Sequence, residues 1–100
     1  MNDVLLTLIA RPDAEEIVID WLLGRDELSG FTGEAAWGHS REHGRFNLVE
    51  QVTGRQRRSI FHLKLEQDAA APLLEAMRDE LAGLGLRYWI VPLLDSGAIA

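Results

Sequence analysis

The pattern of apolar and polar residues along the chain predicts four β-strands. Residues 4–9 form an apolar run with enough β-branched side chains for a buried strand. Residues 59–65 alternate strictly between apolar and polar side chains, as expected of a half-buried strand in an antiparallel sheet. Two further strands are expected at residues 29–37 and 86–94, and Pro92 indicates that the last one is an edge strand or ends there.

Two amphipathic helices are predicted between these strands. Apolar residues recur with helical spacing from Ala14 to Leu22, and Asp13 forms a capping-box-like pair with Glu16 at the start. Gly24 is a natural end for this helix. The second helix is expected at residues 68–81, with an apolar stripe made of Leu73, Leu74, Met77 and Leu81 and continuing to Leu84.

The resulting order, βαββαβ, predicts a single α+β domain over residues 1–100 with the ferredoxin-like plan. In this plan an antiparallel four-stranded sheet carries both helices on one face. The opposite face stays open, and the third strand presents Ile60, His62 and Lys64 on it. An open sheet face on a chain of 100 residues favours association with further copies. Trp37 and Trp89 are expected to pack inside the protein or at such a subunit interface.

Charge is distributed unevenly along the chain. Ten Lys and Arg residues against sixteen Asp and Glu residues give a net charge of −6, which argues against a nucleic-acid-binding protein. The predicted loop between the second and third strands, about residues 39–58, is nevertheless basic. It holds two glutamates and five arginines, which are Arg41, Arg45, Arg55, Arg57 and Arg58. A basic segment on an acidic protein indicates an anionic ligand or an acidic partner, or else a solvated loop whose arginines pair with nearby carboxylates.

The composition excludes several classes of protein. The absence of cysteine excludes disulfides and thiolate catalysis. No apolar run approaches the roughly 18–20 residues that span a bilayer, so direct membrane insertion is not expected. The start, Met1-Asn2-Asp3, lacks the basic region of a secretory signal peptide. With neither a membrane span nor a signal peptide visible, we expect a cytoplasmic protein. No Ser-His-Asp or Cys-His arrangement is visible either, so we expect that the protein is not an enzyme.

Three short segments resemble a known family. They are Gly38-His39-Ser40-Arg41-Glu42-His43, Glu50-Gln51-Val52-Thr53-Gly54-Arg55 and Tyr88-Trp89-Ile90-Val91-Pro92. Together with the βαββαβ order, they resemble the PII superfamily of trimeric signalling proteins, and more closely a family of small bacterial PII-like proteins known as domain of unknown function 3240. The resemblance implies a homotrimeric regulatory protein. Members are often encoded beside heavy-metal efflux pumps, which implies an efflux transporter or another regulatory protein as the partner.

The resemblance also implies a type of ligand. PII proteins bind adenine nucleotides in the clefts between subunits, through the base of the loop and the start of the last strand. Gly38 and Arg41 match the loop base, and Gly85 and Arg87 resemble the glycine-lysine element before the final strand. Residues 93–100 hold no arginine, so the basic residues that PII proteins carry beyond the last strand have no counterpart.

The arginines themselves favour an anion site. Arginine side chains suit phosphate and carboxylate, and alternation along a strand places Arg55 and Arg57 on one face and Arg58 on the other. A subunit cleft lined by Arg41, Arg55 and Arg87 would suit a nucleotide or another small anion. The alternative is an ordinary solubilising start of the third strand.

A divalent metal is the second candidate ligand. His39 and His43 are four residues apart and share a face if the turn between them is helical, and Glu42 or Glu50 could add an oxygen. Such ligands suit Zn²⁺, Cu²⁺ or Ni²⁺. The alternative is a pair of solvated loop histidines. Residues 39–43 also spell the zinc-protease motif H-x-x-E-H, but the glycines on both sides leave no room for the long helix that this motif requires.

Overall fold

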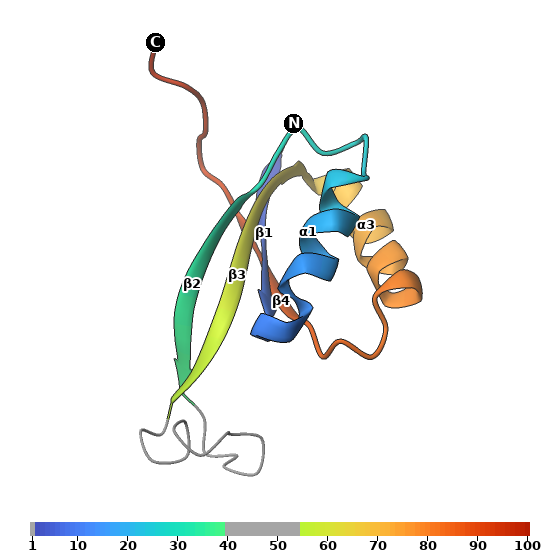
Figure 1. Ribbon diagram of the computed structural model, residues 1–100. Helices are drawn as coiled ribbons and strands as arrows, with labels where there is room; N and C mark the ends of the chain where they lie inside the picture. The colour runs from blue at the N-terminus through green and yellow to red at the C-terminus, as the bar shows by residue number, and fades with distance from the viewer. Residues whose placement is uncertain (1, 40–54) are drawn as a thin grey trace.

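The computed structural model describes residues 2–39 and 55–100 and contains an antiparallel four-stranded sheet with two α-helices on one face (Figure 1). The elements along the chain are β1 (Asp3–Ala10), the short 3₁₀ helix η1 (Pro12–Ala14), α1 (Glu15–Leu23), β2 (Thr32–His39), β3 (Arg55–Glu66), α3 (Gln67–Glu80) and β4 (Arg87–Pro92). The strand order across the sheet is β2-β3-β1-β4, and every neighbouring pair is antiparallel. The predicted α+β, ferredoxin-like architecture is therefore confirmed.

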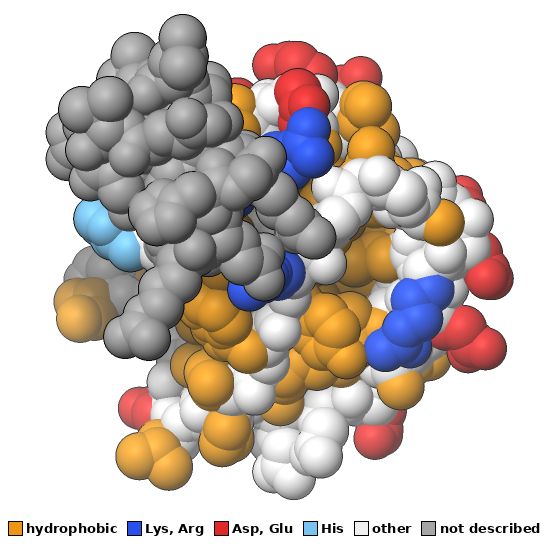
Figure 2. Space-filling view, turned by 90° about the horizontal axis from the view of Figure 1, so that it is seen from below, with side chains coloured by type: hydrophobic (Ala, Val, Ile, Leu, Met, Phe, Trp, Pro, Cys, Tyr) orange, Lys and Arg blue, Asp and Glu red, His pale blue; other side chains and the backbone are white. Residues whose placement is uncertain are grey.

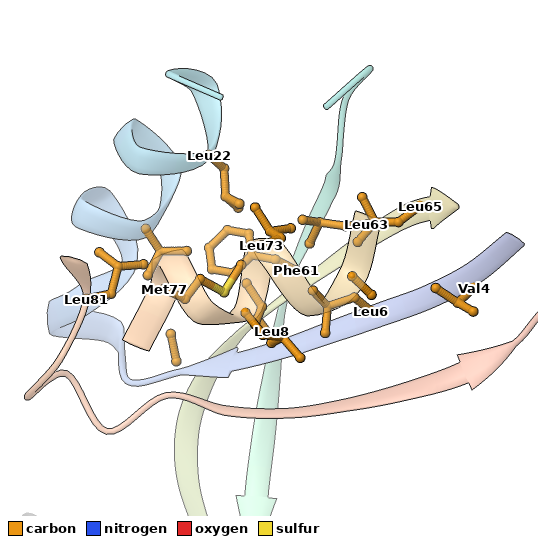
Figure 3. Packing of buried hydrophobic residues seen from close by; sticks show 14 of the residues in the cluster. Val4, Leu6, Leu8, Leu22, Phe61, Leu63, Leu65, Leu73, Met77 and Leu81 are labelled. Atoms are coloured by element: carbon orange, nitrogen blue, oxygen red, sulfur yellow. The ribbon is translucent and has the colours of Figure 1, made fainter. Parts of the chain in front are cut away.

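The hydrophobic core lies between the helices and the face of the sheet that they cover. Leu6 and Leu8 of β1 and Phe61 and Leu63 of β3 point to this side and are at most 2% exposed. Figure 3 shows the side chains that α1 and α3 pack onto them, including Leu22, Leu73 and Met77. Burial of this apolar surface drives the docking of the two helices, because removing apolar area from water is the main favourable contribution to folding.

The first helix begins differently from the sequence prediction. Asp13 lies inside η1, where its carboxylate pairs with Arg11 over 2.7 Å, and the N-cap of α1 is Ala14, without a hydrogen bond from a side chain. Pro12 explains the difference, because its fixed φ starts a 3₁₀ turn ahead of the α-helix. Gly24 is the C-cap of α1, but its φ of −80° is right-handed and needs no glycine.

Both strands that flank the predicted loop run further into it than their sequence pattern indicates, and β2 begins at Thr32, three residues after its predicted start. β3 starts at Arg55 and β2 ends at His39, and these two residues pair with each other. Residues 39 and 55–58 of the predicted loop therefore belong to the sheet. Their polar side chains show no hydrophobic alternation, which is why the pattern missed them. β2 and β3 extend past β1 as a two-stranded ribbon (Figure 1).

Candidate functional site

The open face of the sheet, opposite the helices, is the most extensive candidate site. Across it, Thr7 of β1 pairs with His62 of β3 on one side and with Trp89 of β4 on the other. The neighbouring apolar side chains on this face are half-buried or exposed, namely Leu5, Ile9, Ile60 and Val91. Trp89 is 51% exposed, so it does not belong to the core of the single chain. The prediction that the third strand presents Ile60, His62 and Lys64 on this face is confirmed.

A chain of three polar side chains crosses the middle of the open face. The Thr7 hydroxyl lies 3.2 Å from His62 Nδ1, and His62 Nε2 lies 3.3 Å from Glu34 Oε1. Thr7 is only 2% exposed, whereas Glu34 is more than half exposed. Both imidazole nitrogens therefore have a partner, which fixes the orientation of the ring. Sequence reasoning placed His62 on this face but missed its partners, since they depend on the register of three strands.

Two of the arginines predicted to bind an anion, Arg57 and Arg58, lie in β3 on the β2–β3 ribbon. Its register places Arg57 opposite Trp37 on one face and Arg58 opposite Ala36 on the other, so the predicted alternation of Arg57 and Arg58 is confirmed. The Arg58 guanidinium donates to the Arg57 carbonyl over 2.7 Å and to the Gln56 side chain. Trp37 is 49% exposed and Arg57 is exposed, although each has an interaction of its own in the folded chain. The ribbon thus presents basic and aromatic side chains on a narrow projection.

The other residues predicted to bind an anion are Gly38, Arg87 and Arg41, and the described part of one chain does not bring them together. Gly38 lies beside Arg58, whose Cγ is 3.4 Å from the place that a Cβ at residue 38 would take. Arg87 starts β4, at the opposite edge of the sheet from β2, so one chain does not bring it to the ribbon. Arg41 lies outside the described residues. A cleft that unites Arg87 with the ribbon requires a second copy of the chain.

The predicted metal ligands are only partly described. His39 is the exposed last residue of β2. Glu42, His43 and Glu50 lie outside the described residues. Within residues 2–39 and 55–100, no group of three or more His, Asp or Glu side chains gathers in a way that could hold a metal ion. The metal site therefore stays a prediction.

A cavity of about 320 Å³ opens between the end of α3 and the start of β4. Its floor is apolar and comprises Leu8, Leu74, Met77, Leu81 and Leu86. At its rim the Arg78 guanidinium donates to the Tyr88 hydroxyl over 3.2 Å. Figure 2 views the molecule from this end and shows apolar side chains in the middle of the surface, with acidic side chains around the outer rim. Gly83 and Gly85 both have positive φ, which lets the chain turn into β4 beside the cavity.

The strand order and the placement of both helices define a PII-like fold. A putative PII-like signalling protein from Thermus thermophilus has a similar crystal structure, with a TM-score of 0.64, 13% identity, and coverage of 93% of this chain and 88% of that one. The chain belongs to the family described as "Protein of unknown function (DUF3240)", whose model matches residues 1–100. The crystal structure of a DUF3240 family protein from Shewanella baltica is similar as well. Its TM-score is 0.80, its identity 28%, and the match covers 100% of this chain and 99% of that one. No curated protein matches the chain.

In the part of the chain that the structure describes, neither α-helix is long and apolar enough to cross a membrane.

Proposed function

We propose that this protein is a non-enzymatic, PII-like regulatory module that assembles into a homotrimer through its open sheet face and binds a small anion at its basic ribbon. The open face is the observation that carries the proposal. It joins four strands, and both helices lie on the other side of the sheet. Trp89 and Val91 are exposed on it beside three half-buried aliphatic side chains.

Self-association would bury the apolar surface that a single chain leaves exposed on the open face. A domain of 100 residues has a thin core, and contiguous exposed apolar surface on a small protein marks an interaction site. Every residue of β4 is exposed, although the strand pairs with β1 along its whole length. The trimer in particular follows from the resemblance to PII proteins, and a cyclic assembly of identical chains is the usual form for such a contact.

The ribbon is the part of the molecule suited to a small anion. Arg57 and Arg58 stand on a projection of a protein whose net charge is −6, so the ribbon is a local basic site on an acidic molecule. Arginine binds phosphate and carboxylate oxygens with paired N–H donors. A nucleotide or another small anion held between the ribbon and a neighbouring subunit would change how the ribbon presents itself to a regulatory partner, such as an efflux transporter.

The proposal is tested first by the mass of the protein in solution. Light scattering at micromolar concentration should give three times the chain mass of 11.2 kDa. A stable monomer would overturn the proposed architecture.

Ligand binding is tested next by calorimetric titration with ATP, ADP, AMP and inorganic phosphate, and separately with Zn²⁺, Cu²⁺ and Ni²⁺. An anion that binds the wild-type trimer should bind the Arg57→Gln/Arg58→Gln variant at least about tenfold more weakly, because charge-assisted hydrogen bonds are lost. Arg11→Gln, on the exposed chain beside η1, is the matched control and should bind normally. Binding of a metal but of no anion would contradict the anion proposal.

A further inference from the structure

The cavity between the end of α3 and the start of β4 lies on the helix-covered side of the sheet. Leu8 of β1, Met77 of α3 and Leu81 after α3 line it, and all three also belong to the hydrophobic core (Figure 3). Tyr88 lies on the same side, because it pairs with Leu8 in the ladder of β1 and β4. One chain therefore forms this cavity, which shares no lining residue with the ribbon or the open face.

The volume and the lining of the cavity select the body of a ligand. An apolar cavity of about 150 Å³ takes up benzene, whereas this cavity measures about 320 Å³. By that comparison it holds roughly ten to twelve carbon atoms, the size of a naphthalene ring or a medium-length alkyl chain. Leu and Met side chains form its floor, and they favour an apolar body over a sugar or a nucleobase, because buried polar groups without partners are costly.

The rim of the cavity selects the head group. The Arg78 guanidinium donates to the Tyr88 hydroxyl over 3.2 Å and lies 6.0 Å from the centre of the Tyr88 ring. Among the described residues, no carboxylate lies within ion-pair distance of Arg78. The Tyr88 hydroxyl accepts the bond from Arg78 and keeps its own proton to donate. A guanidinium beside a hydroxyl donor matches the two oxygens of a carboxylate, and one cation neutralises one negative charge.

We infer that this cavity binds an amphipathic monocarboxylate, with its apolar body on the Leu and Met floor and its carboxylate held by Arg78 and Tyr88. An apolar pocket with a few convergent polar groups is typical of small-molecule sites. Ligands with several phosphates fit poorly, because the acidic side chains around this end of the molecule repel further negative charge (Figure 2). The inference goes beyond the proposed function and requires neither the trimer nor an anion at the ribbon.

Calorimetric titration with 2-naphthoate tests the head group. Arg78→Gln should weaken binding at least about tenfold, and Tyr88→Phe about threefold to tenfold, because a charge-assisted hydrogen bond and a neutral one are lost in turn. Lys64→Gln removes one positive charge from the exposed open face and is the matched control, which should bind normally. The neutral probe 2-naphthamide should bind at least about tenfold more weakly than 2-naphthoate and should not distinguish Arg78→Gln from the wild type.

A methionine methyl signal tests the location of the ligand. The chain has two methionines, so a sample labelled with ¹³C at the methionine methyl groups gives two signals, and Met77→Leu identifies the one that belongs to the cavity. The Met77 methyl resonance should shift as 2-naphthoate is added, because the aromatic ring lies against it, and the shift should saturate at the calorimetric affinity. Saturable binding of 2-naphthoate that leaves this signal unchanged would place the ligand elsewhere and overturn the inference.

A series of alkyl carboxylates tests the apolar body. From hexanoate to octanoate to decanoate, each step of two methylenes should tighten binding about tenfold, because each methylene is removed from water. An affinity that does not change along the series would show that the cavity does not hold the chain, and would overturn the inference.

The remaining outcomes separate this inference from the proposed function. If neither 2-naphthoate nor decanoate binds at millimolar concentration, or if Arg78→Gln and Lys64→Gln weaken binding equally, the inference is wrong and the proposed function is unaffected. If the protein is a monomer that binds 2-naphthoate through Arg78, the proposed trimer fails and this inference stands.

Discussion

The same strands build both faces of the sheet, but the two helices cover only one of them. The other face stays open in the single chain. In β1, Leu6 and Leu8 face the helices and are almost fully buried, whereas Leu5 and Ile9 face the other way and are half-buried. The residues are chemically alike and adjacent in sequence. The comparison shows that alternation decides which face a side chain joins, while the helices decide which face is covered.

The faces also differ in their polar content. The helix-covered side is packed by Leu, Phe and Met side chains, and the open side carries the chain from Thr7 through His62 to Glu34. Thr7 and His62 already have hydrogen-bond partners, so a second surface can cover them at little cost. The open face is therefore suited to contact with a mixed polar and apolar surface, and not to a second layer of helices.

The largest expected effect comes from shortening a side chain on the helix-covered face. Leu63→Ala should lower the free energy of unfolding by about 3 kcal/mol, because it leaves a cavity among side chains that cannot fully collapse. Ile60→Ala, on the open face of the same strand, should cost clearly less. Urea denaturation at a protein concentration below that of assembly measures both. Equal losses would mean that the two faces are equally important for the stability of the single chain.

The next effect separates the two sides of β4. Trp89→Ser should weaken self-association by about 2 kcal/mol, roughly thirtyfold in a dissociation constant, because a large apolar side chain at the interface is lost. Tyr88→Ser is its matched control, since Tyr88 is 45% exposed on the opposite face of the same strand. Sedimentation velocity should show a normal assembly for the control. Equal weakening by both variants would argue against the open face as the interface.

The sequence predicts the helix-covered face well, because strict alternation from Phe61 to Leu65 and the apolar stripe of the second helix depend on residues close in sequence. The open face is harder to predict. The contact of His62 with Thr7 joins residues 55 positions apart, and its contact with Glu34 joins residues 28 apart. Such contacts depend on strand register, which the alternation of one strand does not specify.

The candidate site illustrates the same limit. The sequence grouped Arg87 with the arginines of the predicted loop, but the strand order puts Arg87 at the β4 edge and the ribbon at the β2 edge. The ends of β2 and β3 were misjudged because polar residues of the ribbon show no periodicity, although they continue the backbone ladder to the pair of His39 with Arg55. The pair of Asp13 with Glu16 predicts a cap at Asp13, but this local motif does not reveal the 3₁₀ turn that Pro12 starts and in which Asp13 lies.

A smaller effect tests whether the polar chain on the open face stabilises the fold. A double-mutant cycle of Thr7→Val and His62→Leu should give a coupling energy of about 1 kcal/mol, the usual net contribution of one hydrogen bond. The control cycle pairs Thr7→Val with Lys64→Gln, a residue on the same face that Thr7 does not contact through a hydrogen bond. Urea denaturation of the proteins in both cycles gives the two couplings. A coupling no larger than the control would show that the hydroxyl and the imidazole act independently.

The smallest effect concerns the charged contacts of Arg25, which lie on the helical layer that covers one face of the sheet. Arg25 lies over the Trp21 ring of α1, binds Glu27 over 2.8 Å and lies 3.6 Å from Glu80 of α3, so it ties the chain after α1 to the second helix. The pKa of Glu27 is lowered from its ordinary value of 4.5, first by a hydrogen bond from its own backbone amide and then by the Arg25 side chain. The unfolded chain therefore takes up this proton before the folded chain does as the pH falls. The stabilising contribution of Glu27 is present above pH 4.5 and is lost as the pH falls through the lowered pKa.

Glu27→Gln should remove this part of the pH dependence, so that the urea midpoints of the variant fall less between neutral pH and pH values below 4.5 than those of the wild type. The difference should be small, because an exposed carboxylate is well screened by water. Glu16→Gln, an exposed glutamate in the first turn of α1, removes the same charge and is the matched control. If both variants show the same pH dependence, the pair of Arg25 with Glu27 does not help to hold the helical cover. The difference in stability between the two faces would then come from the apolar core alone.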